Sequence, residues 1–441
     1  MKTGCGPDPA EAEPLPSELP PGISKTLILV GAAALVGALT GLLGVVFLRL
    51  LDEANGLRLA LVEALRGWPA GVGLGLMMLG TSLIVGLAAW MVKSLAPNAV
   101  GSGVPYVEKI LRGTGFPRHE FVLPVKFLGG LLALSSGMIL GREGPMVQMG
   151  AVIVERVGKM IRGVSGIWRP LMAAGAGAGL GAAFNAPVSG TLFILEEVLR
   201  KVTPLGFVLA GTAAAGAAFV QRGIFGQGLG FQVGPSPAGP AWNLPVYAIF
   251  GLFVGTLGVV YNRYLLALAG SKGLAHRLPA VPRALGIGLL VGAVGWFLPS
   301  DIGGGDDLTQ RVLSGQGGMA FLITVAVARF VLGPLCYAAA TPGGIFAPIV
   351  ALGALTGGAA GILLHVLLPD VFPSPVAFAI VGIVAFFTAC IRAPLTGMVI
   401  CLEMTACFGL FLPMLAGCLG AYLLATLAKD EPVYDALASK T

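Results

Sequence analysis

Charge is scarce in this chain of 441 residues, and its scarcity excludes a water-soluble protein. Charged side chains make up 11% of the residues and hydrophobic ones 56%, and the mean hydropathy is +0.90. A soluble domain carries about 25% charged residues. Several stretches contain no Asp, Glu, Lys or Arg over the roughly 20 residues that a spanning helix needs. The plainest of them are 26–48, 70–92, 241–262 and 371–391. The composition therefore predicts an all-α polytopic membrane protein.

Histidine and cysteine are also few, which argues against a metal or haem centre. The three histidines (His119, His276 and His365) are scattered, and the six cysteines match no metal-binding spacing. Five cysteines lie in or beside apolar segments, where buried free thiols are the expected state. No set of His, Asp or Cys suits a nucleophile–base pair inside a membrane. We expect no metal, no cofactor and no enzymatic activity.

The two ends of the chain predict short polar segments. Residues 1–23 are proline-rich and acidic rather than basic and then apolar, so they predict a polar N-terminal cytoplasmic tail instead of a signal peptide. The last apolar block ends near residue 428, and 429–441 predict a short cytoplasmic segment. The net charge of +6 fits basic cytoplasmic loops in a lipid bilayer without requiring nucleic acid. A bacterial-type cell membrane, the inner membrane in a Gram-negative source, is the simplest location.

Glycine, in contrast, is abundant. There are 68 glycines, about twice the usual share of roughly 7%. Glycine lets membrane helices approach closely, and together with proline it permits broken helices. The apolar block 330–369 is too long for one span and contains Pro-Gly-Gly at 342–344, whereas 127–141 is too short to cross cleanly. We therefore expect broken and tilted helices rather than a bundle of straight ones.

The sequence repeats two motifs in the same order. The segment 145–151 (PMVQMGA) matches 348–354 (PIVALGA) 203 residues later, and 186–190 (APVSG) matches 393–397 (APLTG) 207 residues later. Duplicated halves with broken helices are a common plan of membrane transporters, in which the binding site lies between the repeats. The commoner relation between such halves is inversion, which these motifs alone do not establish. The predicted organisation is a first membrane repeat at 24–222, a linker at 223–240 and a second membrane repeat at 241–428.

Three interruptions share one pattern, in which glycine is followed by a few residues, then by proline and a helical run. They are 101–105 (GSGVP), 141–145 (GREGP) and 343–348 (GGIFAP). Proline suits the first turn of a helix, so each motif predicts a helix N-terminus within an apolar region. Unpaired N–H groups and the positive end of the helix dipole make such a terminus an anion site, one that binds weakly enough to release its ion. The alternative is three loops that merely connect spans.

Glu143 stands at one of these helix starts, and Phe346 is its counterpart in the second half. Burying an acid in a membrane costs about 3 kcal/mol on insertion scales, so such an acid is usually functional. A carboxylate at an anion site competes with the anion, and protonation releases it. Glu143 is thus predicted to be a proton-coupled gate, the alternative being a carboxylate that only caps its helix.

Glu196 and Glu197 are adjacent, and only one of them can face a given pathway because neighbouring helix positions point about 100° apart. Glu196 matches Glu403 in the second half, which indicates a structural role shared by both repeats. Glu197 has no acidic counterpart and lies beside the basic Arg200 near a helix end. It is a candidate for proton transfer, or for a simple ion pair with a basic residue three or four positions on.

Together, GSGVP, GREGPMVQMGA, GGIFAP and RAPLTG…LEMT resemble the signature segments of the CLC chloride channels and transporters, over about residues 24–436. The resemblance implies two inverted repeats, an anion path inside each subunit and a homodimer. It implies that chloride is held by the hydroxyls of Ser102 and Tyr434 and the backbone amides of Ile345 and Phe346. From the residues alone, Tyr434 is equally an interfacial aromatic.

By the same resemblance, Glu143 is the gate and Glu197 the internal proton-transfer residue of a chloride/proton exchanger. The presence of both acids favours exchange over the alternative, a passive voltage- or pH-gated chloride channel on the same fold, because a channel needs no internal proton donor. Arg142, Lys126 and Arg329 either raise the local positive potential and attract anions or satisfy helix C-terminal carbonyls.

Overall fold

The computed structural model describes residues 23–113, 121–160, 168–226, 228–234, 239–270, 273 and 277–440, and these are mainly helical. The first half contains α1 (Ile23–Arg66), α2 (Ala70–Leu95), α3 (Val104–Leu111), α4 (Val122–Ser135), α5 (Glu143–Met160), α6 (Trp168–Phe184), α7 (Pro187–Phe193) and α8 (Pro204–Phe225). The second half contains α9 (Leu244–Ala269), α10 (Ala280–Phe297), α11 (Asp306–Leu313), α12 (Met319–Tyr337), α13 (Phe346–Leu367), α14 (Pro375–Ile391), α15 (Pro394–Thr405) and α16 (Phe411–Leu427). The chain closes with α17 (Val433–Lys440), and the short 3-10 and π segments are η2 (Pro97–Ala99), η3 (Ile194–Val198), η4 (Ala241–Asn243) and η6 (Phe408–Leu410).

The helix starts predicted from the glycine and proline motifs are confirmed. α3 begins at Val104, α5 at Glu143 and α13 at Phe346. The long apolar block 330–369 is divided between α12 and α13, and the Pro-Gly-Gly sequence lies between them. The predicted tail up to residue 22 and several residues of the predicted linker lie outside the described residues.

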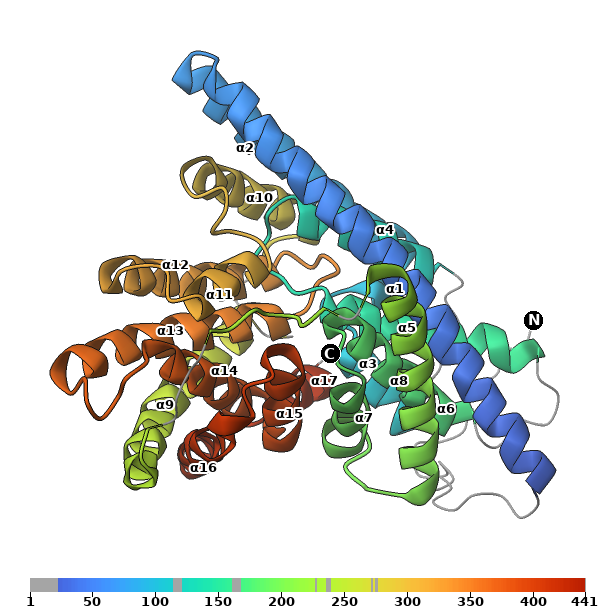
Figure 1. Cartoon of the computed structure of the whole chain (residues 1–441). Helices are drawn as coiled ribbons and strands as arrows, with labels where there is room; N and C mark the ends of the chain where they lie inside the picture. The colour runs from blue at the N-terminus through green and yellow to red at the C-terminus, as the bar shows by residue number, and fades with distance from the viewer. Residues whose placement is uncertain are drawn as a thin grey trace.

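Eight helices in the described part of the chain are long and apolar enough to cross a membrane. They are α1, α2, α8, α9, α10, α12, α13 and the continuous stretch of η6 with α16. α1 runs for 44 residues and continues past the apolar stretch 26–48 that the sequence singled out. The protein is therefore a multi-pass membrane protein, and Figure 1 shows its helices tilted at many different angles.

The contact between Gly141 and Gly344 shows that a two-fold axis relates the two halves. These glycines are equivalent under the 203-residue offset of the repeat. Each donates its backbone N–H to the carbonyl oxygen of the other, at 2.7 Å in both directions, as an antiparallel bridge. Equivalent segments that pair antiparallel are related by a two-fold axis, which is the relation that inverted repeats have.

Glu196 and Glu403 give a second, reciprocal contact between the halves. The Glu196 carboxylate accepts hydrogen bonds from the first turn of α15, including the Thr396 N–H at 2.7 Å. The Glu403 carboxylate accepts the matching bonds from the first turn of α7, including the Ser189 N–H at 2.7 Å. Each acid therefore caps a helix of the opposite repeat. This arrangement agrees with the structural role that the repeat predicted for Glu196.

Small residues allow the close packing at the centre of each half. α6 and α14 occupy equivalent places, and almost all their residues are buried. A methyl group added to Gly150 of α5 would stand 2.1 Å from the Gly175 carbonyl oxygen of α6. A methyl group on Gly353 of α13 would stand 2.5 Å from the Gly382 carbonyl oxygen of α14. Only glycine permits these backbone contacts, which bring α5 and α13 into the middle of the molecule.

Candidate functional site

Three helix N-termini meet at the centre of the protein, those of α3, α5 and α13. A methyl group on Gly144 of α5 would stand 2.5 Å from Ser102 Oγ, in the segment that leads into α3. One on Gly344, just before α13, would stand 3.0 Å from the Gly144 backbone nitrogen. The first N–H groups of a helix have no partner inside the helix and lie at the positive end of its dipole. The convergence of three such ends creates an environment suited to an anion.

Glu143 lies at this convergence with 1% of its surface exposed. Its carboxylate interacts with the backbone amide of Ala347 in the first turn of α13. Neither carboxylate oxygen makes a hydrogen bond of normal geometry with a described residue. The side chain thus places a carboxylate at the N-terminus of the equivalent helix in the other repeat.

Ser102 and Tyr434 come together although 332 residues separate them. Both are 1% exposed, and the Tyr434 hydroxyl interacts with the Ser102 side chain. Ser102 Oγ has no hydrogen bond of normal geometry within the described part of the chain. The Ser102 backbone N–H donates to the Tyr337 hydroxyl at 3.4 Å. The hydroxyl groups of Ser102, Tyr337 and Tyr434 therefore lie near one another and close to the start of α5.

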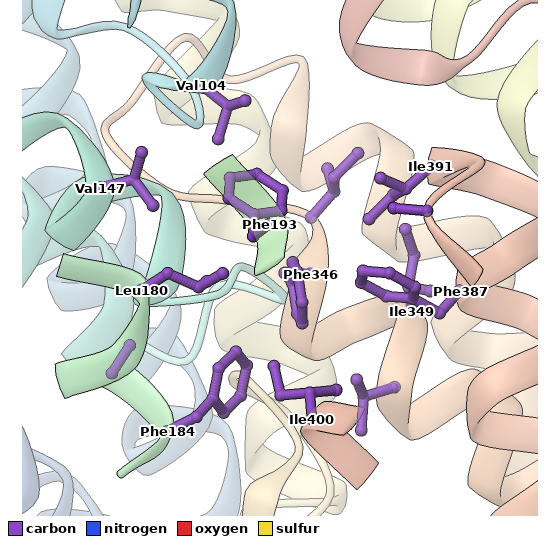
Figure 2. Packing of buried hydrophobic residues seen from close by; sticks show 14 of the residues in the cluster. Val104, Val147, Leu180, Phe184, Phe193, Phe346, Ile349, Phe387, Ile391 and Ile400 are labelled. Carbon is purple, nitrogen blue, oxygen red and sulfur yellow. The ribbon is translucent and has the colours of Figure 1, made fainter. Parts of the chain in front are cut away.

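Ile345 and Phe346 form the start of α13, Ile345 as its N-cap and Phe346 as its first residue. Figure 2 shows the Phe346 ring in the middle of an apolar cluster from several helices. Its centroid lies 5.0 Å from that of Phe184 and 4.5 Å from that of Phe387. This packing fixes the first turn of α13, so its free backbone amides have a defined direction.

Glu197 lies in η3 with 3% of its surface exposed. Arg200 Nη2 stands 3.8 Å from its Oε1 atom, so the ion pair considered as an alternative is present. Burial at this level is unusual for a carboxylate that serves only as a surface partner. Tyr434 is near both Glu197 and Glu143.

Lys126 and Arg329 are buried and support loops instead of lining the site. Lys126 Nζ donates to the carbonyl oxygens of Ala99 and Gly101, the latter at 2.6 Å. Arg329 donates to three carbonyl oxygens in the loop 301–304. The two cations are 203 residues apart and hold equivalent loops in the two repeats. The second alternative of the sequence analysis, satisfaction of helix C-terminal carbonyls, holds only for Ala99 at the end of η2, because the other carbonyls that these cations bond belong to loops.

Two cavities reach the site from different elements. One of about 320 Å³ touches Ser102 and Tyr337, and its charged lining residues in the described part of the chain, Lys109 and Arg283, are basic. The other, of about 210 Å³, touches Ala347, whose amide faces Glu143. Its charged lining residues are Asp52, Arg58, Arg142, Asp306 and Asp307. Arg142 Nη2 lies 3.6 Å from Asp306 Oδ1, so Arg142 forms an ion pair with Asp306.

Two residues close to the site were missed by the sequence analysis. Tyr337 approaches the Ser102 backbone, but it ends an apolar helix and carries no distinguishing signal. Glu108 is fully buried in α3 and forms an ion pair with Arg112 at 3.4 Å. A signal did exist for Glu108, because an acid six residues after Ser102 in a short apolar helix is unusual in a membrane.

Inverted repeats, broken helices and helix N-termini that meet inside the membrane define a membrane transport protein for a small anionic ligand. The family model for the voltage gated chloride channel matches residues 82–426, and the chain belongs to this family. It is 37% identical over 426 residues to the H(+)/Cl(-) exchange transporter ClcA of Salmonella paratyphi A. The alignment covers 94% of this chain and 89% of that protein. The same figures hold for ClcA of Salmonella typhimurium.

Solved structures agree with this membership. A slow cyanobacterial Cl⁻/H⁺ antiporter superposes with a TM-score of 0.89 at 31% identity, covering 96% of this chain and 98% of that one. A CLC-type fluoride/proton antiporter superposes with a TM-score of 0.76 at 20% identity, covering 95% of this chain and 99% of that one. The second likeness shows the shared fold alone. The predicted CLC-type fold is confirmed.

Proposed function

We propose that this protein is a chloride/proton exchanger in which Glu143 and chloride alternate at one site. The observation that carries the proposal is the contact of the Glu143 carboxylate with the Ala347 backbone amide, at the meeting point of three helix N-termini. An ionised Glu143 occupies the place that an anion would take. Protonation removes its charge, so chloride can replace it and the proton travels with the side chain.

The chloride ligands in this proposal are the Ser102 and Tyr434 hydroxyls and the Ile345 and Phe346 backbone amides. The support is their burial, the proximity of the two hydroxyls and the free amides that a helix start provides. These donors carry no full charge, so they bind an anion weakly enough for turnover. Chloride and protons are the only ligands that this mechanism uses, without cofactor or chemical reaction.

In this proposal, Glu197 supplies the proton route between Glu143 and the cytoplasm. It is buried, lies near the chain segment that carries Tyr434 and has no acidic counterpart in the second repeat. A passive channel needs no internal proton donor. The exchanger relatives at 37% and 31% identity support the same choice.

Proteoliposomes test the proposal. With chloride concentrated inside, no pH gradient and the membrane voltage held at zero, chloride efflux should drive protons inward and acidify the interior. Collapse of this proton gradient by an uncoupler confirms that transport produced it. Chloride efflux without proton uptake would make the protein a passive channel.

The double variant Ser102→Ala with Tyr434→Ala should weaken chloride binding. A hydrogen bond to a charged group contributes about 1.5–3 kcal/mol, so the loss of two hydroxyl donors should lower the affinity at least about tenfold. Calorimetric titration with chloride measures it. Ser136→Ala is the control, because its buried hydroxyl bonds the Ala133 carbonyl outside the site. An affinity unchanged in the double variant would remove both residues from the proposed site.

A homodimer is part of the proposal. α7 and α15 have 7 and 12 residues, too short to span a bilayer, yet Val188 and Leu395 at their starts are exposed. α8, which packs against α7, also exposes Phe219. A second copy would cover this apolar face. The purified protein should then have twice the 44.7 kDa mass of the chain, and Val188→Trp should shift it toward the monomer. A monomeric wild-type protein would contradict this assembly.

A further inference from the structure

Asp435 connects α17, which carries Tyr434, to two arginines from distant parts of the chain. Its Oδ1 atom accepts from Arg112 Nη2 at 2.6 Å, at the end of α3, and its Oδ2 atom pairs with Arg200, just after η3. Adjacent helix positions point about 100° apart. Tyr434 is therefore free to face Ser102 while Asp435 faces the arginines. Figure 1 shows α17 beside α3 in the middle of the molecule, where the chain ends.

Each of the two arginines also forms an ion pair with a buried acid. Arg112 Nη2 lies 3.4 Å from Glu108 Oε2, and Arg200 Nη2 lies 3.8 Å from Glu197 Oε1. The Glu108 side chain is 0% exposed and the Glu197 side chain 4%. These five residues, the α17 network, contain three carboxylates and two guanidinium groups. With all of them ionised, the network carries one excess negative charge, which a single proton balances.

Arg200 follows directly after η3, and its φ of +51° is the left-handed value often found just past a helix end. Its side chain is 45% exposed, and its guanidinium group contacts two carboxylates. Arg200 Nε donates to the Glu197 carbonyl oxygen at 3.2 Å, while Nη2 reaches both the Asp435 and Glu197 carboxylates. One guanidinium is thus divided between an acid on α17 and the candidate proton-transfer acid.

We propose that Asp435 is a positioning residue of the exchange cycle, because it holds the Tyr434 hydroxyl beside Ser102. Asp435 also competes with Glu197 for Arg200. This competition links the position of Tyr434 to whether Glu197 carries a proton. When Glu197 is ionised, it draws on Arg200 and weakens the hold on α17. When Glu197 takes up a proton, Arg200 is left to Asp435, and α17 is held more tightly. The link rests on the proposed exchange function.

The charges around these groups are consistent with this competition. Asp435 is outside the spanning helices, and although burial raises its pKa, hydrogen bonds from Arg112 and Arg200 outweigh that effect and hold the pKa below its usual range. Asp435 is therefore ionised at neutral pH, and its hold on α17 is lost only as the pH falls through that lowered value. The charged groups facing Glu197 are Arg200, Glu108 on α3, Asp435 on α17 and Glu196 on its own segment.

Chloride affinity tests the positioning of Tyr434. Asp435→Asn keeps the size of the side chain but cannot pair with both arginines. It should lower the chloride affinity severalfold in calorimetric titration, as Tyr434→Phe should. The double variant should bind no more weakly than Tyr434→Phe alone, because Asp435 acts through Tyr434. Wild-type affinity in Asp435→Asn, or additive losses in the double variant, would overturn the positioning role.

The pH profile of proton flux tests the link to Glu197. In Asp435→Asn, Arg200 is left to Glu197 and a nearby negative charge is lost, so proton uptake should need more acidic conditions. The midpoint of the profile should shift to lower pH. Asp430→Asn is the matched control, because that carboxylate pairs with Arg263 at 3.5 Å outside the network and should leave the midpoint in place. An unshifted midpoint in Asp435→Asn would overturn the link.

Asp435→Glu guards against a variant that does not fold. It keeps the charge but changes the reach, so it should weaken chloride binding while keeping the wild-type pH midpoint. A midpoint that shifts in Asp435→Glu as it does in Asp435→Asn would contradict the role of charge. A wild-type protein that moves no protons would instead refute the proposed exchange, and the chloride titrations would still decide the positioning of Tyr434.

Discussion

Glu143→Gln is expected to leave chloride flux intact or faster and to abolish all proton movement driven by a chloride gradient. Glutamine has the size of glutamate but carries no charge and cannot titrate. It therefore neither competes with chloride at the helix N-termini as an anion nor carries a proton. Chloride flux in the wild-type protein should rise as the pH falls, because protonation releases the carboxylate, and this dependence should disappear in the variant. Chloride and proton fluxes recorded from the same proteoliposomes over a pH series measure both effects.

Glu53→Gln is the control for this change. Glu53 is an exposed carboxylate on α1, outside the site, so its variant should retain coupled transport with the wild-type pH dependence. Proton pumping that survives in Glu143→Gln would show that the gate is elsewhere.

Glu197→Gln is expected to stop proton transport while anions still pass. Glutamine keeps the size of the side chain and its capacity for hydrogen bonds but cannot bind and release a proton. A packing defect therefore does not account for the loss of proton transport. Chloride continues to pass because its proposed ligands are at Ser102, Tyr434 and the start of α13. Both fluxes should be measured on one preparation of vesicles.

Glu196→Gln is the matched control, because the structure gives that acid a different task. Its carboxylate caps α15, as Glu403 caps α7, and these contacts join the two repeats. Glu196→Gln should weaken the folded protein and leave the ratio of chloride to protons unchanged. Coupling lost in Glu196→Gln but retained in Glu197→Gln would mean that the wrong glutamate was chosen. Coupling retained in both would require another proton route.

The breaks in the fold could be predicted because glycine and proline act locally. Proline removes a backbone donor and suits only the first turn of a helix, so the starts of α3, α5 and α13 were visible in the sequence. The length of α1 was not, because α1 continues through the charged residues after Leu48. Hydropathy reports the apolar part of a helix and not where the helix ends. The two-fold relation of the halves needed the antiparallel contact of Gly141 with Gly344, since two short motifs have no orientation of their own.

Candidate site residues could be proposed from the sequence where the repeat or a family motif reached them. Glu143 was singled out by its place at a helix start, and Glu197 by the absence of an acidic counterpart. Tyr434 needed the family resemblance, because an aromatic residue after the last span is equally typical of a membrane interface. The contacts of Asp435 with Arg112 and Arg200 span 323 and 235 residues. No local pattern predicts such pairs, which exist only once both repeats and α17 have packed.

The reversal potential of the wild-type protein in a planar bilayer tests coupled exchange most directly. Chloride is kept equal on the two sides, and a pH difference is the only gradient. An exchanger converts the proton gradient into charge movement, so the current should reverse at a voltage different from zero, with a sign that inverts when the pH gradient is inverted. A current that reverses at zero under both gradients would show passive chloride conduction and contradict the mechanism built on Glu143 and Glu197.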